Sequence, residues 1–123
     1  MMMTQKKYTE FCQSWLAAWT GNLPEKLLSF YSETAYYQDP AHPKGLRGHQ
    51  EIFAYFKKLL AANPNWRWEC DELFPTEKGF TLKWRAHLPG LAAFSGLDLV
   101  EIVDGKISRN EVYFDTAQLR VSK

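Results

Sequence analysis

The sequence predicts a single α+β domain in which three helices come before a sheet of antiparallel strands. Two observations carry this prediction. Apolar residues recur every three or four positions in the first half of the chain, whereas they alternate with polar residues in the second half. The chain has 123 residues, which suits one domain of ordinary size, so the prediction covers 1–123 as a whole.

Three segments have helical periodicity. Residues 4–20 carry one apolar stripe, and Gly21 then favours a helix C-terminus. A short second helix is predicted to begin at Pro24, because proline suits the first helical turn. The third helix covers about 49–62 and ends before Pro64, since the residue preceding a proline disfavours helix.

The segment between the second and third helices is expected to contain little regular structure. Phe30 and Tyr31 are assigned to the buried side of the short second helix. Residues 35–39 form a short β-like run that Pro40 closes. Segment 40–48 contains two prolines and two glycines, so we predict a loop there.

The second half of the chain has the alternation typical of strands with one buried face. The predicted strands are 66–74, 79–88, 94–103 and 107–114. Asp104 and Gly105 between the last two strands favour a tight hairpin turn. Because the helices come first and the strands follow as a run, alternating βαβ units are not expected.

Composition argues against several classes of function. The net charge is +1 and no run of like charges occurs, so we expect neither a nucleic-acid partner nor an anionic membrane. No apolar stretch is long enough to span a bilayer. The N-terminus turns polar at once, without the apolar core of a signal peptide, and we therefore expect a cytoplasmic protein.

No metal or organic cofactor is expected. The three histidines and two cysteines show no spacing typical of metal ligands. The chain also has no glycine-rich phosphate loop. Cys12 and Cys70 lie far apart in apolar patterns, which indicates free buried thiols in a reducing compartment.

The order of segments resembles the nuclear transport factor 2-like superfamily, in particular its ketosteroid isomerase and polyketide cyclase branch. The resemblance rests on YYQDP, the Pro/Gly loop, the GHQEI helix and GLDLVEIVDGKISRNEVYFD, and it runs from Trp15 to about Leu119. It implies a strongly curved, cone-shaped sheet that encloses a pocket with the helices. It also implies a homodimer through the outer face of the sheet. The superfamily includes isomerases, cyclases, hydrolases, dehydratases and binding proteins, so the fold does not determine the function.

Asp39 is the first candidate catalytic residue. It ends the β-like run, and Pro40 biases it toward an extended conformation. A carboxylate placed this way beside an apolar cavity could act as a general base, and the resemblance places Asp39 on the general base of ketosteroid isomerases. The alternative is that Asp39 accepts hydrogen bonds from the amides of the following loop.

Asp98 is the second candidate catalytic residue. It lies mid-strand with the same parity as Phe94 and Val100, and a carboxylate on an apolar face needs a partner or must stay neutral. A neutral carboxyl group can donate a hydrogen bond to a developing enolate. The resemblance places Asp98 on the family's proton-donating Asp. The alternative is a rim residue that forms a salt bridge with Arg85 or Arg109.

Other catalytic elements known in the superfamily are missing. An ungapped count back from Asp39 places Trp15 where the isomerases have their oxyanion-hole tyrosine. An indole N–H lacks an acidic hydroxyl, which weakens the expectation of steroid isomerisation. Related epoxide hydrolases use an Arg and two acids on the last strands, but Gly96 and Val112 stand at two of these positions, so that mechanism is not expected.

The chain is rich in aromatic residues, at 15%, and such side chains can line a ligand cavity or simply fill a core. His42 is assigned to the mouth of the pocket as a possible proton shuttle, the alternative being a solvated loop histidine. The residues predicted to contact a small apolar ligand are Trp15, Trp19, Tyr31, His42, Phe56, Trp84, Val100, Val112 and Phe114.

Three functions fit these observations. The chain could be a cofactor-free isomerase or cyclase-type enzyme, with Asp39 as base and Asp98 as acid acting on an apolar carbonyl compound. It could instead bind a small apolar molecule in the same pocket without chemistry. It could also be a dimeric interaction module in which bulky side chains such as Trp15 and Trp84 fill the pocket.

Overall fold

The computed structural model describes residues 4–119 and confirms the α+β class. The helices are α1 (Gln5–Ala17), α2 (Pro24–Leu28) and α3 (Gly48–Ala62), followed near the end of the chain by a short 3-10 helix, η1 (Thr116–Leu119). The strands are β1 (Tyr31–Asp39), β2 (His42–Arg47), β3 (Arg67–Pro75), β4 (Gly79–His87), β5 (Phe94–Val103) and β6 (Lys106–Tyr113).

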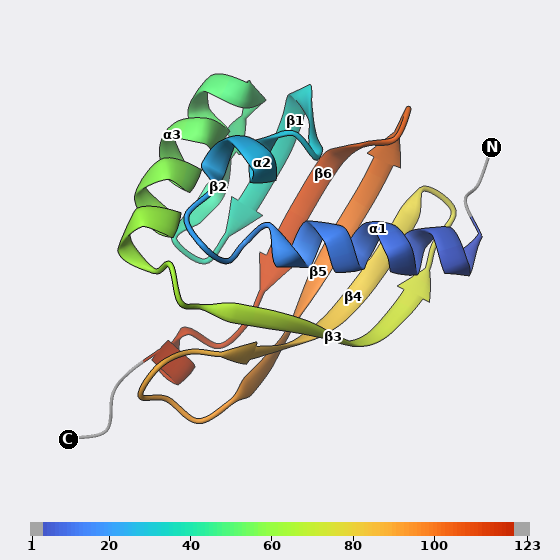
Figure 1. The fold of residues 1–123 in the computed structure, drawn as a ribbon. Helices are drawn as coiled ribbons and strands as arrows, with labels where there is room; N and C mark the ends of the chain where they lie inside the picture. Colours follow the sequence, from blue (N-terminus) through green and yellow to red (C-terminus); the bar gives the residue numbers. More distant parts are fainter. Residues whose placement is uncertain (1–3, 120–123) are drawn as a thin grey trace.

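The six strands form one curved, unclosed sheet in the order β2-β1-β6-β5-β4-β3 (Figure 1). Neighbouring strands are antiparallel, as predicted, except for β1 and β6, which pair in parallel. This parallel pair joins β1, the first strand in the chain, to β6, the last strand in the chain. It brings the end of β1, where Asp39 lies, beside the end of β6.

The helices cover the concave face of the sheet and provide part of the core. Helix α1 crosses the sheet and α3 lies beside β1 and β2 (Figure 1). Tyr8, Cys12 and Trp15 of α1 share one buried stripe, at the spacing that places side chains on one helix face. The rings of Tyr8 and Trp15 pack against Phe80 of β4, with centroids 5.6 and 6.3 Å away.

The predicted loop over 40–48 is wrong, because this segment contains strand β2. The strand lies at the edge of the sheet, where Pro43 interrupts no ladder on its outer side. Gly45 has a positive φ of 82° and lies against the ring of Tyr36, where an added Cβ would come within 2.2 Å of that ring. Proline and glycine therefore mark an edge strand here, although their composition is typical of a loop.

Tyr31 was assigned to the second helix, and this is also wrong. Helix α2 ends at Leu28, and Tyr31 begins strand β1. Its backbone pairs with Ile107 of β6, whose N–H donates to the carbonyl of Phe30 at 2.8 Å. A short helix has only a weak tendency to continue, so pairing with β6 from the far end of the chain makes Tyr31 a strand residue instead.

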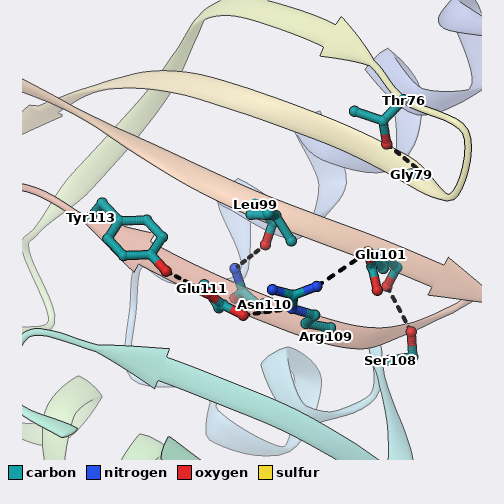
Figure 2. Close-up of polar contacts among 9 residues, drawn as sticks. All are labelled: Thr76, Gly79, Leu99, Glu101, Ser108, Arg109, Asn110, Glu111 and Tyr113. Carbon is teal, nitrogen blue, oxygen red and sulfur yellow. Dashed lines mark hydrogen bonds and ion pairs between the residues drawn. The ribbon is translucent and has the colours of Figure 1, made fainter. Parts of the chain in front are cut away.

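The convex face of the sheet carries a line of paired polar side chains along β6. Arg109 donates to Glu111 at 2.5 Å and to Glu101 at 3.4 Å, and the Tyr113 hydroxyl also donates to Glu111 (Figure 2). Burial alone would raise the pKa of Glu111, but these hydrogen bonds lower it below its usual value. Leu97 and Tyr113 pair across β5 and β6 and remain about half exposed beside this line.

Over residues 4–119, no helix is long and apolar enough to cross a bilayer. Within the same range, His, Cys, Asp and Glu side chains form no group that could hold a metal ion. Cys12 and Cys70 are free thiols, one buried and one half-buried. The cytoplasmic location stays a prediction.

Candidate functional site

A cavity of about 280 Å³ opens between the concave face of the sheet and helices α1 and α3. Its wall is mainly apolar, and eight of its residues are aromatic: Trp19, Tyr37, Tyr55, Trp66, Trp68, Trp84, Phe94 and Phe114. The remaining wall residues are Leu16, Asp39, Pro40, Ala41, Leu59, Asp98, Val112, Thr116 and Leu119. The cavity thus has two carboxylates in its wall and no other ionised side chain from the described part of the chain.

The rings of the aromatic wall form two clusters of mutual contacts. On the sheet side, Trp68 packs edge-to-face on Trp84 with centroids 5.0 Å apart, and Trp84 packs the same way on Phe114 at 5.8 Å. On the helix side, the ring of Tyr37 lies 6.2 Å from Trp19 and 5.9 Å from Tyr55. Rings that contact one another in this way are held in place before any ligand arrives.

Asp39 ends β1 and is only 7% exposed. Its Oδ1 accepts from the backbone N–H groups of Ala41 and His42, at 2.9 and 3.1 Å. Its Oδ2 accepts from the hydroxyl groups of Tyr37 and Tyr55, at 2.8 and 2.6 Å. The structure therefore shows the bond to the loop amides that we gave as an alternative, and it also places the carboxylate in the cavity wall.

These four hydrogen bonds use the acceptor capacity of the Asp39 carboxylate, which is about four positions. Burial first, and then the charge of Asp39, raise the pKa of the Tyr37 hydroxyl. Burial and the hydrogen bond to Asp39 raise the pKa of Tyr55 in the same direction. Both tyrosines therefore remain protonated donors, so a base role for Asp39 requires one of its hydrogen bonds to break.

Asp98 lies in the middle of β5 and is 5% exposed. Its Oδ1 accepts from the indole N–H of Trp84 at 2.7 Å, and its Oδ2 accepts from the amide of Asn110 at 2.9 Å. Burial raises the pKa of Asp98 to about 7; the two hydrogen bonds lower it, and the charge of Asp39 raises it. The sequence left open whether Asp98 faces the pocket or the rim; in the structure it lies in the cavity wall, and it is in none of the ion pairs among residues 4–119.

A buried relay fixes the direction of the hydrogen bond from Asn110. The indole N–H of Trp15 donates to the Tyr31 hydroxyl at 3.1 Å, and Tyr31 donates to Oδ1 of Asn110 at 2.8 Å. Because an indole can only donate, the single hydroxyl hydrogen of Tyr31 must go to Asn110. The amide oxygen of Asn110 then faces Tyr31 and its NH₂ group faces Asp98. The two side chains that hydrogen-bond to Asp98, those of Trp84 and Asn110, therefore both act as donors.

Gly96 makes room for the indole that contacts Asp98. It pairs with Trp84 across β4 and β5. A Cβ at position 96 would lie 2.2 Å from Cζ2 of Trp84. The absence of a side chain at Gly96 thus lets the indole lie over β5 and reach the carboxylate two residues further along the strand.

The structure brings six of the eleven predicted site residues into the cavity wall: Asp39, Asp98, Trp19, Trp84, Val112 and Phe114. Trp15 and Tyr31 form the relay behind Asp98, and Phe56 and Val100 are buried in the core outside the wall. His42 lies edge-on to Tyr55 with centroids 4.3 Å apart. The functional roles of all eleven residues stay predictions.

Several residues of the site were not singled out by the sequence. Tyr55 lies three positions after Ile52 and so shares the apolar stripe of α3, a signal that was available. Trp68 alternates with polar neighbours and could be found in the same way. Asn110 has the same parity as Val112 and Phe114, so its inward orientation could also be found, but its hydrogen bond to Asp98 could not.

Comparisons with known proteins agree with this fold. The SnoaL-like domain matches residues 12–110. A SnoaL-like protein of unknown function from Burkholderia thailandensis is 18% identical, with 94% of this chain and 99% of that chain covered and a TM-score of 0.81. No curated protein matches the chain.

Two further structures share the fold and hold or were designed to hold a small molecule. A hypothetical protein of ketosteroid isomerase-like fold from Catenulispora acidiphila, in complex with trimethylamine, is 20% identical over 89% of this chain and 88% of that chain, with a TM-score of 0.73. A computationally designed 17-OHP binder is 18% identical over 88% and 93%, with a TM-score of 0.73. The family match over most of the chain is decisive: this protein belongs to the SnoaL-like domain family of the nuclear transport factor 2-like superfamily.

Proposed function

We propose that this chain binds a small, mainly apolar organic molecule in its cavity. The observation that carries the proposal is an aromatic wall interrupted by two buried carboxylates, one on β1 and one on β5. Ligand sites typically combine an apolar wall with a few convergent polar groups. The volume of about 280 Å³ suits a ligand of one ring with a short substituent.

The similar structures support the same proposal at the level of the fold. The Catenulispora protein holds trimethylamine, and the designed protein binds 17-OHP. Both have the curved sheet and helices of this chain. The fold therefore accommodates small organic molecules of different size, and the wall residues decide which molecule is accepted.

Binding is favoured over catalysis by the hydrogen-bond donors around the carboxylates. Proton abstraction beside a carbonyl needs a donor aimed at the developing oxyanion. Tyr37 and Tyr55 both donate to Asp39, and Trp84 donates to Asp98. Each of these polar hydrogens is already engaged, which favours a binding site.

A titration with neopentylbenzene, a neutral probe, tests the proposal through quenching of tryptophan fluorescence, since four tryptophans line the wall. Val112→Phe adds bulk to the wall and should abolish binding. Val103→Phe makes the same change at an exposed site outside the cavity and should bind like the unmodified chain. Equal weakening of binding by both variants contradicts the proposal.

A second candidate is the cofactor-free enzyme, with Asp39 as base and Asp98 as acid. The specific observation in its favour is the Asp98 carboxyl, whose pKa is raised to about 7 by burial. Because the protein presents only donors to Asp98, the proton of a neutral Asp98 has no acceptor except a molecule in the cavity. Such a proton could be given to a carbonyl oxygen.

Hydrogen–deuterium exchange at the methyl group of acetophenone in D₂O, followed by NMR, tests the enzyme candidate. Exchange above the buffer rate that is lost in Asp39→Asn, with the circular dichroism spectrum retained, supports it. Exchange at the buffer rate with the unmodified chain, or full exchange with Asp39→Asn, removes Asp39 as the base.

We also propose a homodimer through the convex face of the sheet. Leu97 and Tyr113 are 45% and 49% exposed side by side on that face, and such apolar patches often mark interfaces. Light scattering after size-exclusion chromatography should give the mass of a dimer for the unmodified chain and of a monomer for Leu97→Glu. Leu23→Glu, at a residue 50% exposed outside the sheet, should stay dimeric.

A further inference from the structure

The charges of the cavity are unbalanced. Over residues 4–119, its wall contains the carboxylates of Asp39 and Asp98 but no lysine, arginine or histidine. The ion pairs of the described chain involve Lys83, His87 and Arg109, all outside the cavity wall. A buried carboxylate is costly unless it is hydrogen-bonded or paired with a positive charge. The protein supplies the hydrogen bonds here but not the positive charge.

The aromatic rings of the wall favour the same type of occupant. The face of an aromatic ring attracts a cation, most strongly for tryptophan, and this attraction is larger where water is excluded. Four tryptophans, two tyrosines and two phenylalanines surround the cavity. An organic anion would meet two carboxylates in this wall, whereas a neutral molecule would leave both without a countercharge.

Of the two carboxylates, only Asp98 has acceptor capacity left. Asp39 receives four hydrogen bonds, which fill its about four acceptor positions. Asp98 receives one on each oxygen, from Trp84 and Asn110. A ligand N–H can therefore bond to Asp98 without displacing a donor of the protein.

We propose that the molecule bound in this cavity is an organic cation, a protonated amine or quaternary ammonium compound, with its charge beside Asp98 and its apolar groups against the aromatic wall. This proposal rests on the proposed binding function and specifies its ligand class. It differs from the neutral carbonyl compound expected from the sequence. Asp39 keeps a positioning role, because it holds the β1–β2 turn and Tyr55 in the wall.

The proposal implies a dependence on pH. A cation bound beside Asp98 favours its ionised form, so affinity should increase as pH rises through the titration of this residue. The titratable groups whose charges act on Asp98 are Asp39 and Tyr31 of β1 and Cys12 of α1. Burial raises the pKa of both Tyr31 and Cys12, so neither of them ionises in the range tested.

The experiment compares benzyltrimethylammonium with neopentylbenzene, its neutral carbon isostere. The positive charge of the first does not titrate, and the two molecules have nearly the same shape. Tryptophan fluorescence at pH 8 should show about tenfold tighter binding of the cation, a difference of about 1.4 kcal/mol. At pH 5.5, where Asp98 is mostly protonated, this preference should decrease, while the affinity for the neutral isostere should stay constant.

Asp98→Asn should show a smaller preference for the cation at pH 8, and this preference should no longer depend on pH; its fold is checked by circular dichroism. The two-pH comparison on the unmodified protein needs no variant, so it remains informative if Asp98→Asn does not fold. Equal or tighter binding of neopentylbenzene at pH 8 overturns the cation proposal and leaves the binding function standing. Failure of both probes to bind the unmodified chain overturns both.

Discussion

Asp39 and Asp98 are the same type of residue in the wall of one cavity, and both are almost fully buried. Their surroundings differ. Asp39 receives two hydrogen bonds from the turn that follows it and two from tyrosines on β1 and α3. Asp98 receives two, both from side chains of the flanking strands.

This difference shows that burial and position do not by themselves identify a functional carboxylate. A carboxylate whose acceptor positions are filled stabilises the fold around it, as Asp39 joins the β1–β2 turn to helix α3. A carboxylate with free positions can still respond to an incoming molecule. The comparison therefore supports our proposal that Asp98 contacts the ligand, whereas the hydrogen bonds of Asp39 support the fold.

The largest expected effect is the pH dependence of stability that Asp98 produces. Burial raises its pKa from 3.8 to about 7, so between these values the folded state binds more protons than the unfolded chain. The free energy of unfolding therefore falls as pH rises through this window, by about 4 kcal/mol for roughly three pKa units. Urea unfolding at several pH values between about 4 and 8 measures this decline.

The matched variant for this measurement is Asp98→Asn, which cannot ionise. Its amide will face a donor of Trp84 or Asn110, which lowers stability at every pH, so the slope against pH is the readout. A slope equal to that of the unmodified protein would show that other groups cause the decline.

The next largest effect is expected for Asp39→Ala. Removing the carboxylate leaves the Tyr37 hydroxyl without its buried acceptor and releases two loop amides, so the free energy of unfolding should fall by about 3 kcal/mol. Asp115→Ala is the control. Asp115 is exposed, follows β6 and accepts from one backbone N–H, of Ala117, at 2.9 Å. Its loss should cost about 1 kcal/mol or less, and equal losses would remove the structural role of Asp39.

A smaller effect is expected from the relay behind Asp98. Tyr31→Phe leaves the buried Trp15 N–H and the Asn110 oxygen without a partner, at a cost of about 2 kcal/mol. It also releases the orientation of the Asn110 amide, so the pKa of Asp98 should rise further. Tyr36→Phe removes a hydroxyl from the same strand that bonds only Gln38 and should cost about 0.5 kcal/mol. Urea unfolding and a carboxyl NMR titration measure the two results; an unchanged Asp98 titration contradicts the relay.

The smallest effect is expected for Tyr55→Phe. Asp39 keeps its other three donors, so the loss in unfolding free energy should be about 1 kcal/mol. Tyr113→Phe, which also removes a hydroxyl bonded to a carboxylate but on the convex face, should change stability by about 0.5 kcal/mol or less. A loss for Tyr55→Phe as large as that for Asp39→Ala would mean that Tyr55, rather than the loop amides, dominates this site.

Periodicity was enough to predict the helices and five of the six strands, and it placed Asp98 on the same strand face as Phe94 and Val100. These follow from local rules, because apolar neighbours of the same parity share one face of a strand. Strand β2 was missed because Pro43 is tolerated in a strand only at the edge of a sheet, and no local rule shows where that edge lies. The parallel pairing of Tyr31 with Ile107 joins distant segments and could not be read from either one.

The candidate site was predicted less completely than the fold. The two carboxylates and four wall residues were found, but the partners that give the carboxylates different roles were not. Tyr55 reaches Asp39 from another element, and the Asn110 amide is held toward Asp98 by Tyr31 of β1. Hydrogen-bond partners depend on tertiary packing, which the spacing of residues in a sequence does not determine.

The contact between Gly96 and Trp84 limits which residues related chains can carry at these two positions. Any side chain at position 96 would displace the indole that both lines the cavity and bonds the buried acid. Positions 84 and 96 should therefore change together among related chains, with a smaller ring at one accompanying a larger residue at the other. Covariation of these two positions would then indicate changes in ligand preference, even where the ligand itself is not known.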